Sequence, residues 1–455
     1  MAKAKTAYVC RECGAQAPKW SGQCADCGDW NTLEEASGPV APGAGGRRIG
    51  YAGAASSIRL LSEIAADRTR RTPTGMDEFD RVLGGGIVPG SVVLLGGEPG
   101  IGKSTLLLQL LAEVHGRLPG LYAAGEESLE QISLRAARLG LPQLPLPMLA
   151  ETAVEEILAH CHSGRPALLV VDSIQTMYTA ALQSAPGAVA QVREVAAQLV
   201  RYAKQTGTAV VLVGHVTKEG ALAGPRVLEH MVDTVLYFES DVGGRYRIVR
   251  AAKNRFGAVN ELGIFAMTDQ GLKPVSHPSA IFLSRRAEAV AGSVITCVRE
   301  GSRPLLLEVQ ALVDDSSLGN PRRLTVGLDT NRLAMLLAVL HRHGSAMLQG
   351  HDVFLNVVGG MRIGETGADL AAVLSVWSSF RDHPLPMQTV VFGELGLSGE
   401  VRPVAAGEER LQEAAKHGFS RAIVPAANVP RRAPAGLEVV GVRRLQDALD
   451  VLGSA

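Results

Sequence analysis

The sequence predicts an α/β protein whose central domain contains a mainly parallel sheet covered by helices on both faces. Between residues 58 and 270, short β-branched apolar runs alternate with amphipathic stretches, as in parallel strands joined by helices. A glycine-rich phosphate-binding sequence joins one such strand to one such helix. Four cysteines within the first 34 residues and a change of texture after residue 270 predict a further domain at each end.

The bulk composition is that of an ordinary globular protein. The chain has 455 residues, of which 46% are hydrophobic and 20% charged, and this length suits about two or three domains. Lys plus Arg and Asp plus Glu both number 45, so the net charge gives no global argument for nucleic acid. We find no run of 18 apolar residues and no apolar leader, and therefore expect a cytoplasmic protein without a membrane partner.

Residues 1–34 are predicted to form a zinc finger. The ligands are two C-x-x-C pairs, namely Cys10, Cys13, Cys24 and Cys27. This spacing suits a closed tetrahedral Zn²⁺ site, and clustered cysteines in a reducing compartment favour metal over disulfides. A module of this length cannot bury enough surface to fold alone. We therefore expect the metal to supply its folding energy. Two interpretations stay open for Lys19, Trp20 and Trp30, which either serve a partner or DNA or pack the small core.

The rest of the chain is divided by composition. Residues 35–57, rich in Ala, Gly and Pro, are predicted to be a linker, followed by the central α/β domain over 58–270. A second linker is expected over 271–285, and a separate α/β domain over 286–455. The strands expected in the central domain are 92–95, 168–171, 209–213 and 234–238, with helices over 106–115, 129–139 and 189–203. The last domain is expected to contain strands 294–298 and 305–313 and a helix over 333–343.

The phosphate-binding sequence matches G-x-x-x-x-G-K-[ST] in full. The nucleotide-binding residues are Gly97, Glu98, Pro99, Gly100, Ile101, Gly102, Lys103, Ser104 and Thr105. Its glycines let backbone N–H groups surround a phosphate, and the helix that follows adds positive potential. Lys103 is expected to contact the β- and γ-phosphates of ATP, while the Ser104 hydroxyl binds Mg²⁺.

Polar residues at three other strand ends complete the predicted catalytic site. Asp172 follows an apolar run and is predicted to help hold Mg²⁺. Glu126 is our preferred carboxylate for orienting the attacking water, with neighbouring Glu127 as the alternative. His215 ends a further strand and is either a sensor of the γ-phosphate or an edge histidine with satisfied hydrogen bonds.

Several segments together resemble a known family. "TPTGMDEFDRVLGGGIVPGSVVLLGGEPGIGKST" resembles the opening of the ATPase core in the RecA superfamily. The four-cysteine N-terminus, "KNRFG" at 253–257 and "GELGLSGEVRPV" at 393–404 narrow the resemblance to the bacterial RadA (Sms) family. It covers nearly the whole chain and implies a RecA-like P-loop ATPase core between a zinc finger and a Lon-protease-like α/β domain.

The resemblance implies a function in DNA repair and recombination. Members of this family are ring-shaped homo-hexamers that use ATP to move on single-stranded and branched DNA, and they extend strand exchange by branch migration alongside the RecA recombinase. In the comparison with RecA, Glu126 takes the place of the catalytic glutamate and His215 that of the polar sensor. Lys253 would reach the ATP of the neighbouring subunit like an arginine finger, with Arg255 assisting. Without the resemblance, "AAKNRFG" would be interpreted as a solvent-facing basic turn.

DNA contacts follow from the same resemblance. In RecA-like folds the loop after the strand that ends at His215 faces DNA. Its cations here are Lys218 and Arg226, which would pair with phosphates. The alternative is an ordinary mobile surface loop.

The C-terminal segment 393–419 resembles the proteolytic domain of Lon, whose chemistry requires a serine and a lysine. This chain has Gly367 where that pattern places the serine and Glu408 where it places the lysine, and neither can replace the missing group. Ser398 and Thr366 do not restore the pair. We therefore expect a non-catalytic oligomerisation platform and DNA-binding ring. Its candidate phosphate contacts are Arg322, Arg323 and Arg402, for which a solvated face is the commoner explanation.

Two alternatives to a DNA-dependent ATPase motor follow. An ATP-dependent Lon-type protease is disfavoured because its dyad is missing. A DNA-binding protein that uses ATP only as an assembly switch is not separated from a motor by the sequence.

Overall fold

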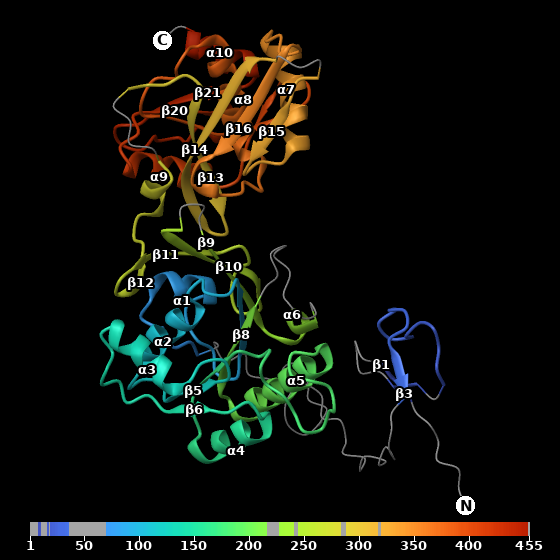
Figure 1. Cartoon of the computed structure of the whole chain (residues 1–455). Coiled ribbons are helices and arrows are strands. Elements are labelled where there is room, and N and C mark those ends of the chain that lie inside the picture. Colours follow the sequence, from blue (N-terminus) through green and yellow to red (C-terminus); the bar gives the residue numbers. More distant parts are fainter. Residues whose placement is uncertain are drawn as a thin grey trace, which may run out of the picture. The chain divides into compact units, whose positions relative to one another are not determined.

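The computed structural model divides the chain into two units, one of residues 1–240 with 245–274 and the other of 241–244 with 275–455 (Figure 1). Three predicted site residues, Cys13, Lys218 and Arg226, lie outside the residues that the structure describes. The described residues are 8–10, 16–17, 19–35, 70–215, 227–240, 244–283, 288–316 and 320–453. Among them, no helix is long and apolar enough to cross a membrane.

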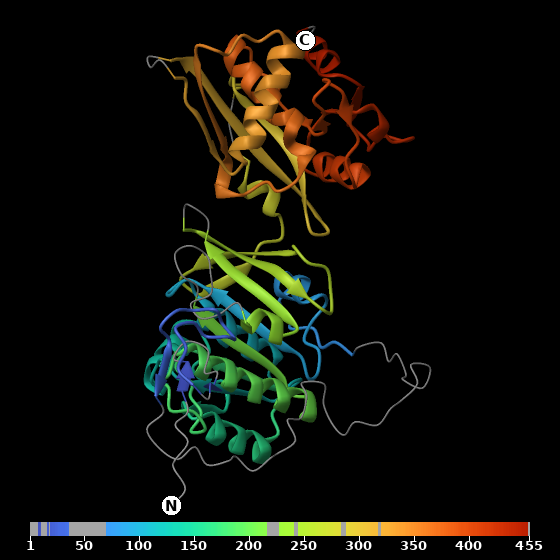
Figure 2. The same cartoon turned by 90° about the vertical axis from the view of Figure 1, so that its right-hand side faces the viewer.

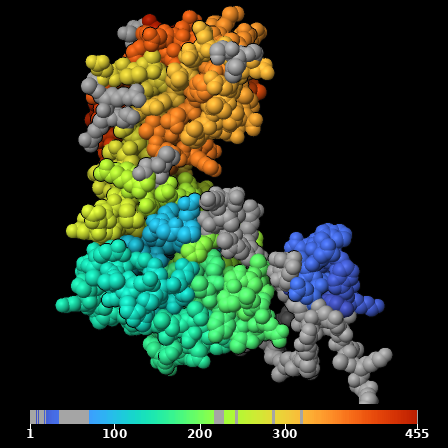
Figure 3. Space-filling model, in the orientation of Figure 1, coloured from blue at the N-terminus to red at the C-terminus, as the bar shows by residue number. Residues whose placement is uncertain are grey.

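The cysteine module, blue in Figure 3, is a small antiparallel sheet. Strand β1 (Tyr8–Cys10) lies between β2 (Gln16–Ala17) and β3 (Leu33–Glu35). Its buried cluster consists of Cys10, Cys24 and Leu33. Trp20 and Trp30 are 55% and 69% exposed and lie outside this buried cluster, which leaves the interpretation that they serve a partner or DNA.

The rest of the first unit, which contains the predicted ATPase domain, is built on one nine-stranded sheet in the order β12-β11-β10-β9-β4-β8-β7-β5-β6. The parallel strands are β4 (Val92–Gly97), β5 (Gly120–Ala124), β6 (Met148–Ala150), β7 (Leu168–Asp172), β8 (Ala209–His215) and β9 (Thr234–Ser240). The antiparallel extension is β10 (Tyr246–Asn254), β11 (Leu262–Thr268) and β12 (Gly271–Pro274). Because the parallel strands are covered on both faces, their sequences are continuous apolar runs.

Helices cover both faces of this sheet (Figure 1). One face carries α1 (Asp77–Leu83), α2 (Lys103–Val114) and α3 (Leu129–Arg138). The other carries α4 (Val154–Gly164), α5 (Val189–Thr206) and α6 (Val227–Met231). Helix α3 begins with a reciprocal capping box between Ser128 and Gln131, which fixes where the chain turns after β5. The carboxyl ends of β4, β5, β7 and β8 therefore meet at one edge of the sheet.

The segment predicted as the second linker is partly regular. Strand β12 pairs with β11 and so extends the ATPase sheet, and a 3₁₀ turn (Pro278–Ile281) follows. The Ser279 hydroxyl in this turn donates to Glu413 at 2.6 Å, which attaches the turn to the second unit. The change of unit therefore falls between β12 and this turn.

The second unit contains a mixed seven-stranded sheet in the order β15-β16-β14-β13-β17-β20-β21 (Figure 2). Its strands are β13 (Ser293–Glu300), β14 (Arg303–Asp315), β15 (Arg323–Val326), β16 (His351–Val357), β17 (Thr389–Val391), β20 (Arg421–Pro425) and β21 (Glu438–Val442). A separate pair is formed by β18 (Glu394–Leu395) and β19 (Val401–Arg402). The helices are α7 (Thr330–Gly344), α8 (Asp369–Arg381), α9 (Gly407–Lys416) and α10 (Leu445–Gly453).

Candidate active site

The phosphate loop lies between β4 and α2 and has the close backbone approach that a phosphate cradle requires. Gly100 and Gly102 have φ values of +75° and +114°, a region that favours glycine. A Cβ at Gly97 would lie 2.7 Å from the Phe238 carbonyl oxygen of the neighbouring strand β9. Side chains at these positions would therefore clash or strain the loop, and the glycines leave its backbone open to an anion.

Lys103 begins α2 and points its ammonium back into this loop. Its side chain is buried, and Nζ donates to the carbonyl oxygens of Gly97 at 2.8 Å and Glu98 at 2.9 Å. Burial lowers the pKa of Lys103, and the charges of Asp172 and Glu126 oppose that effect. The ammonium thus lies inside the cradle, where the β- and γ-phosphates of a nucleotide would meet it.

Glu126 and His215 meet at the carboxyl edge of the sheet. His215 Nε2 lies 2.8 Å from Glu126 Oε1, and its Nδ1 lies 3.4 Å from Lys103 Nζ. The Ser173 hydroxyl donates to the same Glu126 oxygen. The hydrogen bond from His215 is the largest cause of a lowered pKa of Glu126. The neighbouring Glu127 is engaged elsewhere, because it accepts from Arg135 of α3 at 2.6 Å.

Asp172 ends β7 and is 8% exposed. Its carboxylate accepts a hydrogen bond from the phenol of Tyr122, and burial raises the pKa of Tyr122, so that the phenol remains the donor. An interaction with the Ser104 hydroxyl opposes this rise in the pKa of Tyr122. A carboxylate and a serine hydroxyl are hard oxygen donors of the kind that suits Mg²⁺.

The sequence did not reveal Tyr122 or Ser173 as parts of this site. Tyr122 belongs to an apolar run that predicts a core strand, and Ser173, which directly follows Asp172, is typical of a turn. Only the pairing of β5 with β7, in which Ala124 lies opposite Asp172, brings the phenol to the carboxylate.

Lys253 and Arg255 contact the region around α6. Lys253 Nζ donates to the carbonyl oxygens of Glu229 at 2.6 Å and Val232 at 2.8 Å. Burial is the first cause of a lowered pKa of Lys253. An Arg255 Nη lies 3.4 Å from the buried carboxylate of Asp233. In the described part of the chain, both cations are therefore held by their own subunit.

Three of the predicted zinc ligands converge. The sulfur atoms of Cys10, Cys24 and Cys27 all lie within 4.8 Å of one another, and Cys10 Sγ is 3.7 Å from Cys27 Sγ. Zn–S bonds of about 2.3 Å in a tetrahedron place two sulfurs about 3.8 Å apart, so these residues fit Zn²⁺. Cys161 and Cys297 are buried outside this cluster, and burial raises the pKa of Cys161 to about 11.

One of the two positions expected to lack protease chemistry, Gly367, borders an ion pair with a buried arginine. Arg410 of α9 is 0% exposed and donates to both carboxylate oxygens of Glu365 at 2.7 Å. A Cβ at Gly367 would lie 3.0 Å from Glu365 Oε1 and 3.3 Å from Arg410 Nη1. Glu408 lies on the exposed side of α9. A charged pair thus borders the place of the nucleophile.

Other side chains considered in this domain are engaged with neighbours. The hydroxyl of Thr366 donates to Glu394 and that of Ser398 to Glu400. Arg322 is paired with Asp352 at 2.7 Å, and Arg402 with Glu400 at 2.5 Å. Arg323 donates to the Leu348 carbonyl oxygen at 2.8 Å.

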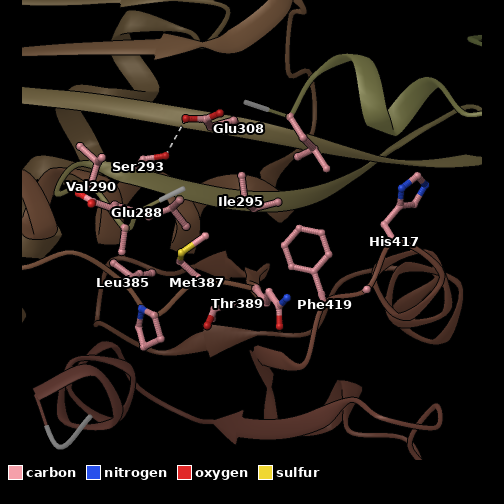
Figure 4. Close-up of a pocket in the computed structure, with 16 residues that line it drawn as sticks. Glu288, Val290, Ser293, Ile295, Glu308, Leu385, Met387, Thr389, His417 and Phe419 are labelled. Atoms are coloured by element: carbon pink, nitrogen blue, oxygen red, sulfur yellow. Dashed lines mark hydrogen bonds between the residues drawn. The ribbon is translucent and has the colours of Figure 1, made fainter. Parts of the chain in front are cut away.

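The second unit contains a cavity of about 240 Å³, and Figure 4 shows the side chains that line it. Leu385, Met387 and Phe419 contribute apolar walls, and Ser293 donates to the buried Glu308 at 2.7 Å. Neither Gly367 nor Glu408 lines this cavity. It is therefore separate from the protease-like positions.

Comparisons with known proteins cover all three parts of the chain. Residues 61–221 match the AAA domain, 8–35 the rubredoxin metal binding domain and 342–428 the subunit ChlI of Mg-chelatase. The chain is 63% identical to the DNA repair protein RadA of Pseudomonas aeruginosa, over 99% of this chain and all of that one. It is 57% identical to RadA of Escherichia coli and 49% identical to RadA of Bacillus subtilis, over 99% of each chain. A KaiC-like protein of Pyrococcus horikoshii aligns at 22% identity with a TM-score of 0.39, and the alignment covers 46% of this chain and 99% of that one.

Proposed function

Because the chain belongs to the RadA family of bacterial DNA repair proteins, we propose that it is a DNA-dependent ATPase that drives branch migration of recombination intermediates. The fold is the α/β P-loop ATPase core expected from the sequence, with an N-terminal cysteine zinc ribbon and a ChlI-like α/β domain after it. An AAA domain implies ATP hydrolysis, and the family name implies a role at DNA.

The convergence of Lys103, His215 and Glu126 is the observation that supports hydrolysis best. Lys103 would bind the β- and γ-phosphates, while Ser104 and Asp172 would hold the Mg²⁺ that neutralises phosphate charge when bound. Glu126, whose pKa is lowered by its hydrogen bond from His215, would act as the base: it would align the attacking water with the γ-phosphate and accept a proton from it. His215 connects this carboxylate to Lys103 and is suited to sense whether the γ-phosphate is present.

We further propose that hydrolysis is completed by a neighbouring copy in a homo-hexamer. Lys253 would give up its hydrogen bonds to the carbonyl oxygens of Glu229 and Val232 in its own subunit. With Arg255 assisting, it would then stabilise transition-state charge in the adjoining subunit. Single-stranded and branched DNA would contact Lys218 and Arg226, and RecA recombinase is the expected protein partner. The C-terminal domain would serve as the platform for ring assembly and DNA binding.

Replacement of Lys103 tests the motor. Lys103→Ala should abolish hydrolysis and branch migration of a synthetic Holliday junction while DNA binding stays largely intact. Lys273→Ala is the matched control, because this exposed lysine of the same domain contacts Gln270 and lies outside the site. If Lys103→Ala still moved branched DNA, a motor would be excluded. If the unsubstituted protein hydrolysed ATP without moving branches, the protein would be an ATP-switched DNA-binding protein.

A further inference from the structure

A tyrosine contacts one of the two predicted magnesium ligands. Tyr122 lies on β5, and its phenol donates to a carboxylate oxygen of Asp172, which ends the neighbouring strand β7. The contact joins two strands at the edge of the sheet where the predicted site lies.

Sheet geometry explains why Tyr122 reaches this point. Ala124 pairs with Asp172 and Tyr122 with Val170, so the tyrosine begins two residues before the strand end. Side chains alternate along a strand, so Tyr122 and Asp172 share the face covered by α2. The ring packs in that face's apolar core, where Tyr122 is 1% exposed. A well-packed ring leaves its hydroxyl little freedom to move.

We propose that Tyr122 is a positioning residue that holds the Asp172 carboxylate in the orientation required for magnesium-bound nucleotide. This role rests on the proposed ATPase function. The Asp172 side chain is buried at the strand end, and its carboxylate accepts a hydrogen bond from the Tyr122 phenol. Hydrogen bonds to metal-binding carboxylates fix their orientation, and loss of such a bond commonly lowers metal affinity about 10- to 100-fold. Tyr122 itself neither binds the phosphates nor exchanges a proton.

The test is the magnesium dependence of nucleotide binding, measured by fluorescence of a methylanthraniloyl ATP analogue. Tyr122→Phe should weaken binding about tenfold in saturating Mg²⁺ and leave binding unchanged in magnesium-free buffer. Tyr202→Phe is the matched control: Tyr202 is also a buried tyrosine of this unit, but its hydroxyl contacts Thr208 and the Cys161 carbonyl oxygen. This control should behave like the unsubstituted protein in both buffers.

A double variant separates a role through Asp172 from a general packing effect. If Tyr122 acts through Asp172, Tyr122→Phe should add little to the loss caused by Asp172→Asn. Equal loss with and without Mg²⁺, full additivity, or unchanged affinity would each overturn the inference. Lys103→Ala provides the separate check on the proposed function, because magnesium-dependent binding that survived this substitution would place the nucleotide elsewhere.

Discussion

His215 Nε2 lies 2.8 Å from Glu126 Oε1, and the same imidazole lies 3.4 Å from the Lys103 ammonium through its other nitrogen. This histidine thus joins the residue predicted to orient water to the residue predicted to bind phosphate. A substitution at His215 should therefore change the pKa of Glu126, although His215 itself is not expected to contact the attacking water.

The pH dependence of hydrolysis should reveal this connection. The hydrogen bond from His215 is the largest cause of the lowered pKa of Glu126, so His215→Leu, which cannot donate a hydrogen bond, should let that pKa rise toward its ordinary value. Glu126 would then become protonated at a higher pH. The acid limb of the pH profile of kcat should therefore shift to higher pH. Rates measured from acid to neutral pH check this, with circular dichroism to show that the variant remains folded. An acid limb at an unchanged pH would contradict the role of His215.

The choice between Glu126 and Glu127 is open to direct substitution. Glu126→Gln should lower kcat by about 100-fold or more, because the neutral amide cannot serve as the base. Nucleotide affinity should be nearly unchanged. Glu127→Gln is the matched control, since its carboxylate is paired with Arg135 and should affect kcat only modestly. The opposite ranking in a steady-state ATPase assay would assign the role to Glu127.

The sequence predicts the local parts of this site better than the contacts between distant parts. The phosphate loop is one continuous motif, and Glu126, Asp172 and His215 each follow a recognisable apolar strand, so parallel pairing alone brings them to one edge. Tyr122 was missed because its function depends on the register of β5 against β7. Arg410 was missed because α9 reads as an amphipathic surface helix, and nothing local indicates that one of its arginines is buried.

The cysteine cluster should bind zinc independently of the ATPase core. Cys24→Ser removes one of the converging sulfurs, and we expect purified protein to lose most of its bound zinc because a closed site depends on all its ligands. Cys161→Ala is the matched control, because this cysteine is buried outside the cluster. Elemental analysis measures both. Full zinc retention by Cys24→Ser would show that the metal is held without this residue.

The ion pair between Arg410 and Glu365 should stabilise the second unit. Arg410→Met leaves the half-buried Glu365 without its bidentate partner, and we expect the free energy of unfolding to fall by about 3 kcal/mol. Combining it with Glu365→Leu should recover part of this loss, since an apolar pair avoids the unpaired charge. Arg402→Met removes an exposed pair and should cost no more than about 1 kcal/mol. Scanning calorimetry of the full chain distinguishes these outcomes, and equal effects at both arginines would contradict the role of burial.

The proposed action of Lys253 on a neighbouring subunit can be tested by mixing two inactive variants. Lys253→Ala should keep nucleotide affinity and lose most hydrolysis, whereas Lys103→Ala loses its own nucleotide site but retains Lys253. In a ring with head-to-tail interfaces, random equal mixing places an intact Lys253 beside an intact site at about one quarter of the interfaces. ATP hydrolysis should therefore reappear in the mixture. The rate should increase with the fraction of the protein that is assembled into mixed rings. Mixtures that stay inactive despite subunit exchange would mean that Lys253, which here binds the carbonyl oxygens of Glu229 and Val232, acts only within its own chain.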